Sequence, residues 1–269
     1  MMRLFDQNRI TLFAATAATV IALATGTNSW AAGAEKHQEW NWKGPVPAAA
    51  KLTLHGVNGS IEATPATGNQ IEIVADKHGK KHDPSEVEIK VVQDSDGLTI
   101  CAVYPRGGSP CADHRWTNGR NDSDVQVDFT VRVPAGVAFS ANTVNGGITA
   151  HALSGRVTAH TVNGACDIET SQSGEATTVN GGVRAVLGRV KADDRLKFET
   201  VNGNITLLMP EGVGARLQGG TVNGSIRTDY PVTVSGKWGP KSFDGTIGGG
   251  GARVSANTVN GSIQVRRSQ

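Results

Sequence analysis

The chain has few aromatic residues: Phe, Trp and Tyr make up 5% of its 269 residues. A globular core normally draws much of its bulk from these side chains. Glycine, in contrast, is abundant, with 34 residues. A chain poor in aromatics but rich in glycine and small aliphatic residues favours narrow stacked layers of β-structure over one wide core.

The sequence also lacks a charge imbalance, with 26 basic and 24 acidic residues. The first 34 residues carry only Arg3, Asp6 and Arg9 as charges, so the remainder holds 24 basic and 23 acidic residues. Nucleic-acid binding usually selects a concentrated basic patch. We therefore expect no nucleic-acid partner.

Long apolar runs are missing after the N-terminal segment, so we expect no later transmembrane segment. The segment itself has a basic start, an uncharged stretch over Ile10–Thr27, and small residues at Ala32-Gly33-Ala34. This order is typical of a secretory signal peptide. A membrane anchor is the alternative, but a spanning helix needs about 20 strongly apolar residues. We predict cleavage after Ala34 and export to the periplasm or the cell surface of a bacterium.

Only three cysteines are present. Cys101 and Cys111 flank a plausible hairpin turn, and export places them in an oxidising compartment. We predict a disulfide between them, worth about 2–3 kcal/mol in the chain-entropy description. This pairing leaves Cys166 as the single unpaired cysteine.

The dominant feature is a repeat, because Val-Asn-Gly occurs seven times with successive spacings of 87, 18, 17, 22, 21 and 37 residues. A degenerate copy at Phe243-Asp244-Gly245 would divide the last gap. Self-similarity with a period near 20 indicates a solenoid or a related stack. The predicted structural turn residues are Asn58, Asn145, Asn163, Asn180, Asn202, Asn223, Asp244 and Asn260.

The residues after each turn alternate in character. The third position is aliphatic in almost every copy, with Cys166 as the exception, and the fourth is polar or small. Such alternation is typical of a half-buried strand. Cys166 is thus expected to be a small buried hydrophobe and not a catalytic thiol. The polar column comprises Glu62, Thr149, Asp167, Arg184, Thr206, Arg227, Gly248 and Gln264.

Asn-Gly supplies the turn, since both residues tolerate left-handed backbone conformations. Two architectures fit this pattern: a series of antiparallel hairpins, or a parallel β-helix with Asn-Gly at a corner. Second turn signals such as Ser154-Gly155 and Ser173-Gly174 favour the helix. We therefore predict an all-β, single-stranded parallel β-helix or β-solenoid, in which aligned asparagines form a hydrogen-bonded ladder.

The part before the array carries a single Val-Asn-Gly. We expect an N-terminal β region and cap over residues 35–134, and the repeat solenoid over residues 135–269, because solenoid ends need atypical caps. Polar loops are predicted over 76–85 and 105–124. Trp40 and Trp42 are expected to pack on the first coil, and Trp116 to lie in a loop.

The repeated Thr-Val-Asn-Gly-x-Ile units at 143–148, 200–205, 221–226 and 258–263, with Val131-Arg132-Val133-Pro134 and Gly136-Val137 before them, carry a resemblance. They resemble the bacterial putative-adhesin family of β-strand-repeat proteins, a domain of unknown function. The similarity covers about residues 46–267. It implies a location at the cell envelope or surface and a role in adhesion, and it supplies no catalytic residues.

No motif for nucleophilic catalysis, phosphate binding or calcium binding is recognisable. His78 and His82 have the spacing of a metal pair, but Gly79 and two lysines argue against the necessary helix. His151 and His160 fall in adjoining predicted strands, and we regard them as surface residues. We expect no catalytic residues, no cofactor and no metal site.

These observations favour a non-enzymatic cell-envelope or surface interaction protein that binds a protein or a polysaccharide. One alternative is a polysaccharide-active enzyme, which would need a carboxylate cluster on the strand faces. Another is a structural envelope protein that self-associates through its last coil.

Overall fold

The computed structural model describes residues 35–47, 50–95, 97–105, 111, 122–236 and 239–268. The predicted signal peptide and Trp116 lie outside these residues. The described part contains no helix long and apolar enough to cross a membrane.

The described part of the N-terminal region consists of strands and one 3-10 turn, η1. Its elements are β1 (Lys36–Pro45), β2 (Lys51–His55), β3 (Ile61–Pro65), β4 (Gln70–Gly79), η1 (Pro84–Glu86), β5 (Glu88–Asp94), β6 (Gly97–Val103) and β7 (Gln126–Val133).

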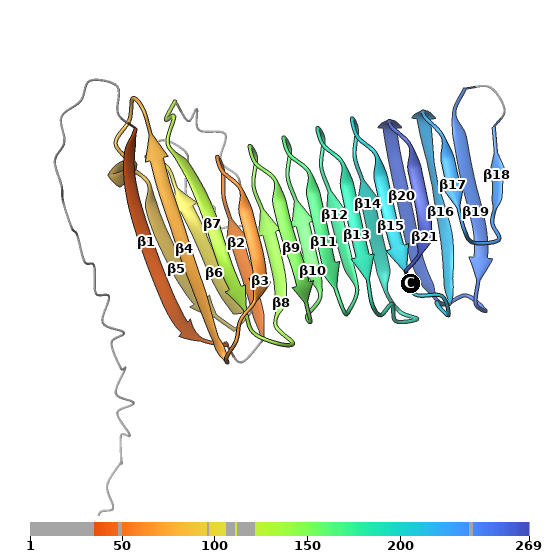
Figure 1. Ribbon diagram of the computed structural model, residues 1–269, viewed down its shortest axis with the longest axis horizontal. Helices are drawn as coiled ribbons and strands as arrows, with labels where there is room; N and C mark the ends of the chain where they lie inside the picture. Colours follow the sequence, from red (N-terminus) through yellow and green to blue (C-terminus); the bar gives the residue numbers. More distant parts are fainter. Residues whose placement is uncertain are drawn as a thin grey trace, which may run out of the picture.

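The repeat region consists of short strands that succeed one another along the long axis of the molecule (Figure 1). The strands are β8 (Ala138–Asn142), β9 (Ile148–Leu153), β10 (Val157–His160), β11 (Cys166–Thr170), β12 (Gly174–Thr177), β13 (Val183–Leu187), β14 (Arg195–Glu199), β15 (Ile205–Met209), β16 (Ala215–Asn223), β17 (Ile226–Thr228), β18 (Thr233–Ser235), β19 (Lys241–Ile247), β20 (Ala252–Asn260) and β21 (Ile263–Arg267).

The fold is all-β and has two large mixed sheets, which we call sheet A and sheet B. Sheet A has ten strands in the order β1-β4-β7-β3-β9-β11-β13-β15-β21-β17, and sheet B has eleven in the order β18-β19-β16-β20-β14-β12-β10-β8-β2-β6-β5. Strands pair in parallel through the middle of each sheet, whereas β1, β4, β5, β18 and β19 pair antiparallel near the ends. The sheets are therefore mixed and not wholly parallel as predicted.

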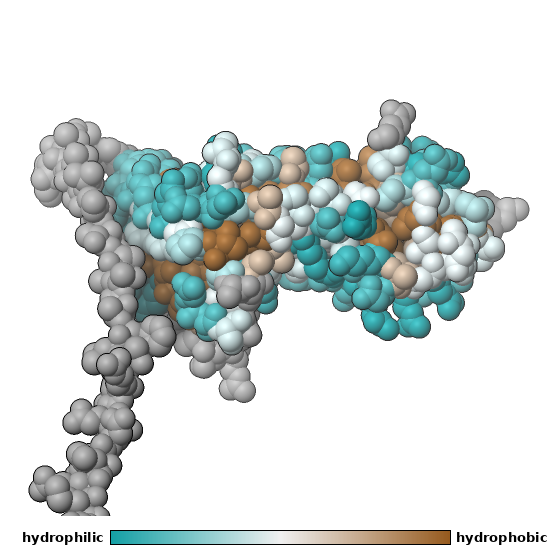
Figure 2. Space-filling model, turned by 90° about the horizontal axis from the view of Figure 1, so that it is seen from below, coloured by the Kyte–Doolittle hydropathy of each residue, from teal (hydrophilic) through white to brown (hydrophobic). Residues whose placement is uncertain are grey.

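From β8 to β18 consecutive strands alternate between the sheets, and each Val-Asn-Gly turn links a strand of sheet B to a strand of sheet A. The core lies between the sheets. Viewed along the strand direction, hydrophobic residues lie along the middle of the visible face of the molecule, with hydrophilic residues on both sides (Figure 2).

The aliphatic column predicted from the sequence stacks in register in the core between the two sheets. In spatial order it is Ile61, Ile148, Cys166, Val183, Ile205, Ile263 and Ile226.

The order of the coils in space differs from their order in the sequence. β14 pairs with β20 and β15 pairs with β21, so the coil of Asn260 lies between the coils of Asn202 and Asn223. Along the sequence, the outermost coil of β16 and β17 comes first, and β18 and β19 follow beyond β16 in sheet B. The next strands, β20 and β21, lie between this outermost coil and the coil of Asn202. The coil that is last in the sequence is therefore internal.

This return path explains the 37-residue gap and corrects the role assigned to Asp244. Asp244 lies within β19, opposite Gln218 of the antiparallel strand β16. It is not a turn residue and contributes nothing to the asparagine row. The Gly-rich sequence after it, Gly248–Gly251, has positive φ angles and makes the turn into β20.

The N-terminal region differs from the prediction in two strands. β1 was not predicted, and it pairs antiparallel with β4 along its whole length. β4 extends to Gly79, through residues assigned to a polar loop, because β1 and β7 pair with it on both sides. Trp40 and Trp42 lie on β1 and pack against the core, as expected.

The structure contains the predicted disulfide between Cys101 and Cys111, whose Cα atoms are 5.8 Å apart. Cys166 is buried in β11, and its burial raises the pKa of its thiol to about 12. A thiol with so high a pKa is protonated at neutral pH and is a poor nucleophile. Cys166 is thus a core residue.

Candidate interaction surface

Each residue of the Thr-Val-Asn-Gly turn has a separate structural role. The threonine points inward and is buried, and its Oγ1 donates a hydrogen bond to a glycine carbonyl of the neighbouring coil. Thr161 donates to Gly146 at 2.8 Å, and Thr200 donates to Gly181 at 2.8 Å. The same contact recurs at Thr143, Thr178, Thr221 and Thr258. The hydroxyl therefore satisfies a buried carbonyl where the chain leaves sheet B.

The valine that follows points outward. Five of these valines expose 38–45% of their surface although they are aliphatic: Val162, Val179, Val201, Val259 and Val222 in spatial order. Val57 and Val144 continue the line and are half-buried. We call these seven residues the valine row. Single exposed valines are common, but an ordered row of them marks a surface that is available to a partner.

The asparagines form a ladder beside the valine row. In space the asparagines follow the order Asn58, Asn145, Asn163, Asn180, Asn202, Asn260 and Asn223. From Asn145 onward, the Nδ2 of each donates to the Oδ1 of the asparagine before it in this order, at 2.8–2.9 Å. All donors point toward the N-terminal end of the stack. Asparagine has two amide hydrogens, so each ladder member retains a second N–H that the ladder does not use.

The glycines are required by the close approach of neighbouring coils. A Cβ at Gly203 would lie 1.9 Å from the carbonyl oxygen of Gly181, and a Cβ at Gly164 would lie 2.1 Å from that of Gly146. The prediction that Asn-Gly adopts a left-handed turn is wrong for the asparagines, because Ala50 and Ala152 are the only described non-glycine residues with positive φ. The motif selects glycine chiefly for its lack of a side chain.

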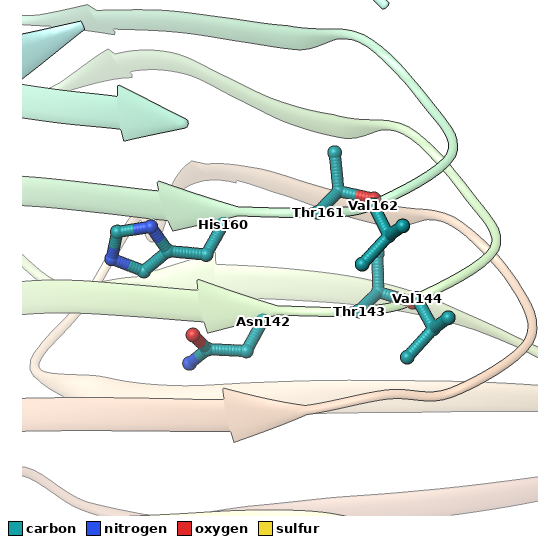
Figure 3. Close-up of a pocket in the computed structure, with 6 residues that line it drawn as sticks. All are labelled: Asn142, Thr143, Val144, His160, Thr161 and Val162. Carbon is teal, nitrogen blue, oxygen red and sulfur yellow. The ribbon is translucent and has the colours of Figure 1, made fainter. Parts of the chain in front are cut away.

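A shallow pocket of about 330 Å³ lies on the sheet B side of the valine row. Figure 3 shows Val144 and Val162 side by side on neighbouring turns, with Asn142 and His160 at the ends of β8 and β10. Burial lowers the pKa of His160, although Glu175 opposes the shift. The imidazole is therefore mainly neutral at neutral pH, and the pocket has an uncharged lining.

The outer face of sheet A is different in character. Its polar column includes the ion pair of Arg184 with Asp167, in which Nη1 and Oδ1 are 2.9 Å apart. Exposed pairs of this kind contribute little to stability. Near sheet B, the largely buried Asp194 lies 3.0 Å from Arg156, and Arg156 also lies 3.5 Å from Glu175. Asp167, Asp194 and Glu175 are thus each paired with an arginine.

Neither His151 and His160 nor His78 and His82 form a pair, in agreement with the sequence analysis. His151 lies on sheet A, 3.7 Å from Glu169, whereas His160 lies on sheet B. His82 binds Asp124 through its Nδ1 at 2.9 Å, while His78 lies on β4 and faces His37. The backbone amides of His82 and Lys81 hold the pKa of Asp124 well below its usual range.

Comparisons with known proteins give structural similarity only. No family model matches the sequence, and no curated protein matches it. A putative cell adhesion protein from Clostridium sporogenes is 12% identical with a TM-score of 0.47, over 86% of this chain and 100% of that one. A putative adhesin from Bacteroides fragilis is 13% identical with a TM-score of 0.38, over 86% and 97%.

A further similar structure, described as a putative lipid binding protein from Parabacteroides distasonis, is 10% identical with a TM-score of 0.23, over 86% of this chain and 97% of that one. The similar structures are mostly described as bacterial putative adhesins, the class that the sequence resembles.

Proposed function

We propose that the protein is an exported, non-enzymatic interaction protein of the cell envelope or surface, whose repeat is a β-solenoid that presents the valine row to a partner. The observation that carries the proposal is the valine row itself. It extends over seven coils in register, beside the asparagine ladder, and neither line of residues contains a charge. The disulfide between Cys101 and Cys111 supports export, because disulfides persist in oxidising compartments.

The chemistry of this surface favours a protein partner. It combines aliphatic side chains with amide groups, and protein interfaces likewise surround an apolar centre with hydrogen-bonding groups. A polysaccharide partner would instead be served by aromatic rings or charged side chains, and the valine row and its ladder contain neither. The row is also rigid, because inter-coil hydrogen bonds fix every turn, so little conformational entropy is lost on binding.

The test is co-sedimentation of the exported protein with insoluble envelope preparations. One sample of the envelope is left intact, one is digested with protease, and one is purified polysaccharide. Retention by intact envelope and loss after protease digestion are the expected results. Retention on purified polysaccharide would contradict the protein partner, and absence of retention on every preparation would contradict the interaction role.

The same supernatants distinguish the enzymatic alternative. A polysaccharide-active enzyme would release new reducing ends from the polysaccharide sample, whereas an interaction protein releases none. Release that persists after repurification of the protein would overturn the proposal and direct attention to the carboxylates of the strand faces.

A further inference from the structure

The antiparallel end of sheet A brings two histidines and several carboxylates onto one outer face. In an antiparallel sheet, directly opposite residues lie on the same face. His37 of β1 is opposite His78 of β4, and Glu39 is opposite Asp76. Asp76 is in turn opposite Asp128 of β7. One row of the face is therefore a histidine pair, and the adjacent row has three carboxylates across three strands.

The carboxylate row calls for a cation. Like charges directly opposite one another destabilise a sheet. The row has two such contacts in succession, from Glu39 to Asp76 and from Asp76 to Asp128. Hydrogen bonds satisfy part of Asp128, whose Oδ1 accepts from the amide and hydroxyl of Ser60 at 2.7 Å. These neutral donors do not remove the charge.

The histidines supply the ligands that would specify the cation. His37 Nδ1 lies 3.6 Å from Asp76 Oδ1, and the rings of His37 and His78 are stacked with centroids 5.5 Å apart. One ligating atom from each of His37, Asp76 and His78 lies within 4.8 Å of the other two. His78 has a side chain only 18% exposed, and its Nδ1 is buried without a hydrogen-bond partner. A buried imidazole nitrogen in this condition has an unused binding capacity.

We propose that His37, Asp76 and His78 form a binding site for a divalent transition metal, with Zn²⁺ as the best fit. Two imidazoles and a carboxylate suit Zn²⁺, whereas Mg²⁺ and Ca²⁺ prefer oxygen ligands alone. Zinc binds nitrogen at about 2.0–2.1 Å, so its ligand atoms lie roughly 3.4 Å apart in a tetrahedron. The ligand atoms now lie within 4.8 Å of one another, so side-chain rotations that bring them closer by up to about 1.4 Å give that spacing. Such rotations are open to His37, because it lies on an exposed edge strand. A water molecule completes the coordination.

The site would fasten β1 to the rest of the molecule. Among the described strands of sheet A, β1 pairs only with β4, so its outer edge is open. A metal ion shared between His37 and His78 joins the two strands across the pair and neutralises part of the carboxylate row. Metal binding therefore stabilises this end of the sheet and leaves the valine row untouched.

The experiment is titration of the untagged, exported protein with Zn²⁺ by calorimetry, after treatment with a chelator. We choose Zn²⁺ over Cu²⁺ because cleavage after Ala34 would place His37 third from a free N-terminus, an arrangement that takes Cu²⁺ without any help from the sheet. One ion per chain is expected. His37→Gln and Asp76→Asn are expected to weaken binding by at least tenfold, because each removes one of three protein ligands.

The matched control is His151→Gln, which removes another exposed histidine that faces a carboxylate, Glu169, away from β1. Its affinity for Zn²⁺ should equal that of the unaltered protein. Hydrogen exchange supplies a second measurement: Zn²⁺ should slow the exchange of β1 amides in the unaltered protein and not in His37→Gln. Equal affinity of the control and either His37→Gln or Asp76→Asn, or no binding by the unaltered protein, would overturn the proposal.

Discussion

The glycine of the repeat gives the most stringent prediction, and Gly203→Ala is the simplest perturbation. The added Cβ would lie 1.9 Å from the carbonyl oxygen of Gly181, 2.5 Å from its carbonyl carbon and 2.9 Å from the nitrogen of Gly182. These are backbone atoms, which no rotamer change moves away. Relief requires the coils to separate locally by about 1 Å, which a close-packed interior resists.

The magnitude follows from what that separation disturbs. Overpacking of this kind costs about 1–3 kcal/mol. The same movement strains the hydrogen bond of Thr200 Oγ1 to Gly181 and the ladder bond between Asn202 and Asn180, both 2.8 Å long. A typical hydrogen bond contributes about 1 kcal/mol. We therefore expect Gly203→Ala to lower the free energy of unfolding by about 3–5 kcal/mol.

Gly212→Ala is the matched control. A Cβ at Gly212 meets no atom within 4 Å, and its φ is not in the left-handed region. Alanine there should be neutral or should stabilise the protein by up to about 1 kcal/mol, through the unfolded chain. The measurement is urea denaturation followed by circular dichroism. Two variants whose free energies of unfolding differ by less than about 1 kcal/mol would refute the close-approach explanation of the motif.

Further predictions concern the ladder, the thiol and pH. Asn202→Ala breaks two ladder bonds and Asn223→Ala breaks one, so the first should destabilise the protein by about 1 kcal/mol more in urea denaturation. A thiol-specific reagent should find no reactive group in the native protein and one, Cys166, after unfolding. Burial lowers the pKa of His160 from 6.5, so below pH 6.5 the unfolded chain binds a proton at His160 more readily than the folded protein does, and the stability of the protein decreases as the pH falls. His160→Gln should remove this part of the decrease, as measured by thermal unfolding at several pH values.

The repeat could be predicted from the sequence because each of its columns has one physical requirement. Ile148 and Val183 occupy the same inward column as Cys166, and the strand alternation identified all three as core residues. The disulfide was predictable from a hairpin-like spacing and an oxidising compartment. The valines of the row are part of the motif, but the residue types of the strand before each turn do not define which of its side chains point inward and which outward.

Other features have no local sequence signal. The coil of Asn260 lies between those of Asn202 and Asn223, and all three have the same Val-Asn-Gly motif, so nothing in the motif itself encodes its neighbour. Asp244 resembled a repeat because Asp-Gly-Thr-Ile imitates the turn sequence, yet antiparallel pairing with β16 determines its position. The histidine and carboxylate face depends on the register of β1 with β4, a long-range contact that spacing along the chain does not reveal.

The central claim is that the valine row binds the partner, and a matched pair of valine variants tests it directly. Val162, Val179 and Val201 are each changed to threonine, which preserves shape and strand preference while replacing a methyl by a hydroxyl. The control changes Val91 and Val234, which are equally exposed but lie off the row, on β5 and β18.

Affinity for intact envelope is measured by co-sedimentation at increasing protein concentration. Each buried methyl contributes about 0.8 kcal/mol, so the triple variant should bind on the order of 100-fold more weakly, and the control should bind as the unaltered protein does. Equal affinity of the triple variant and the control would contradict the account.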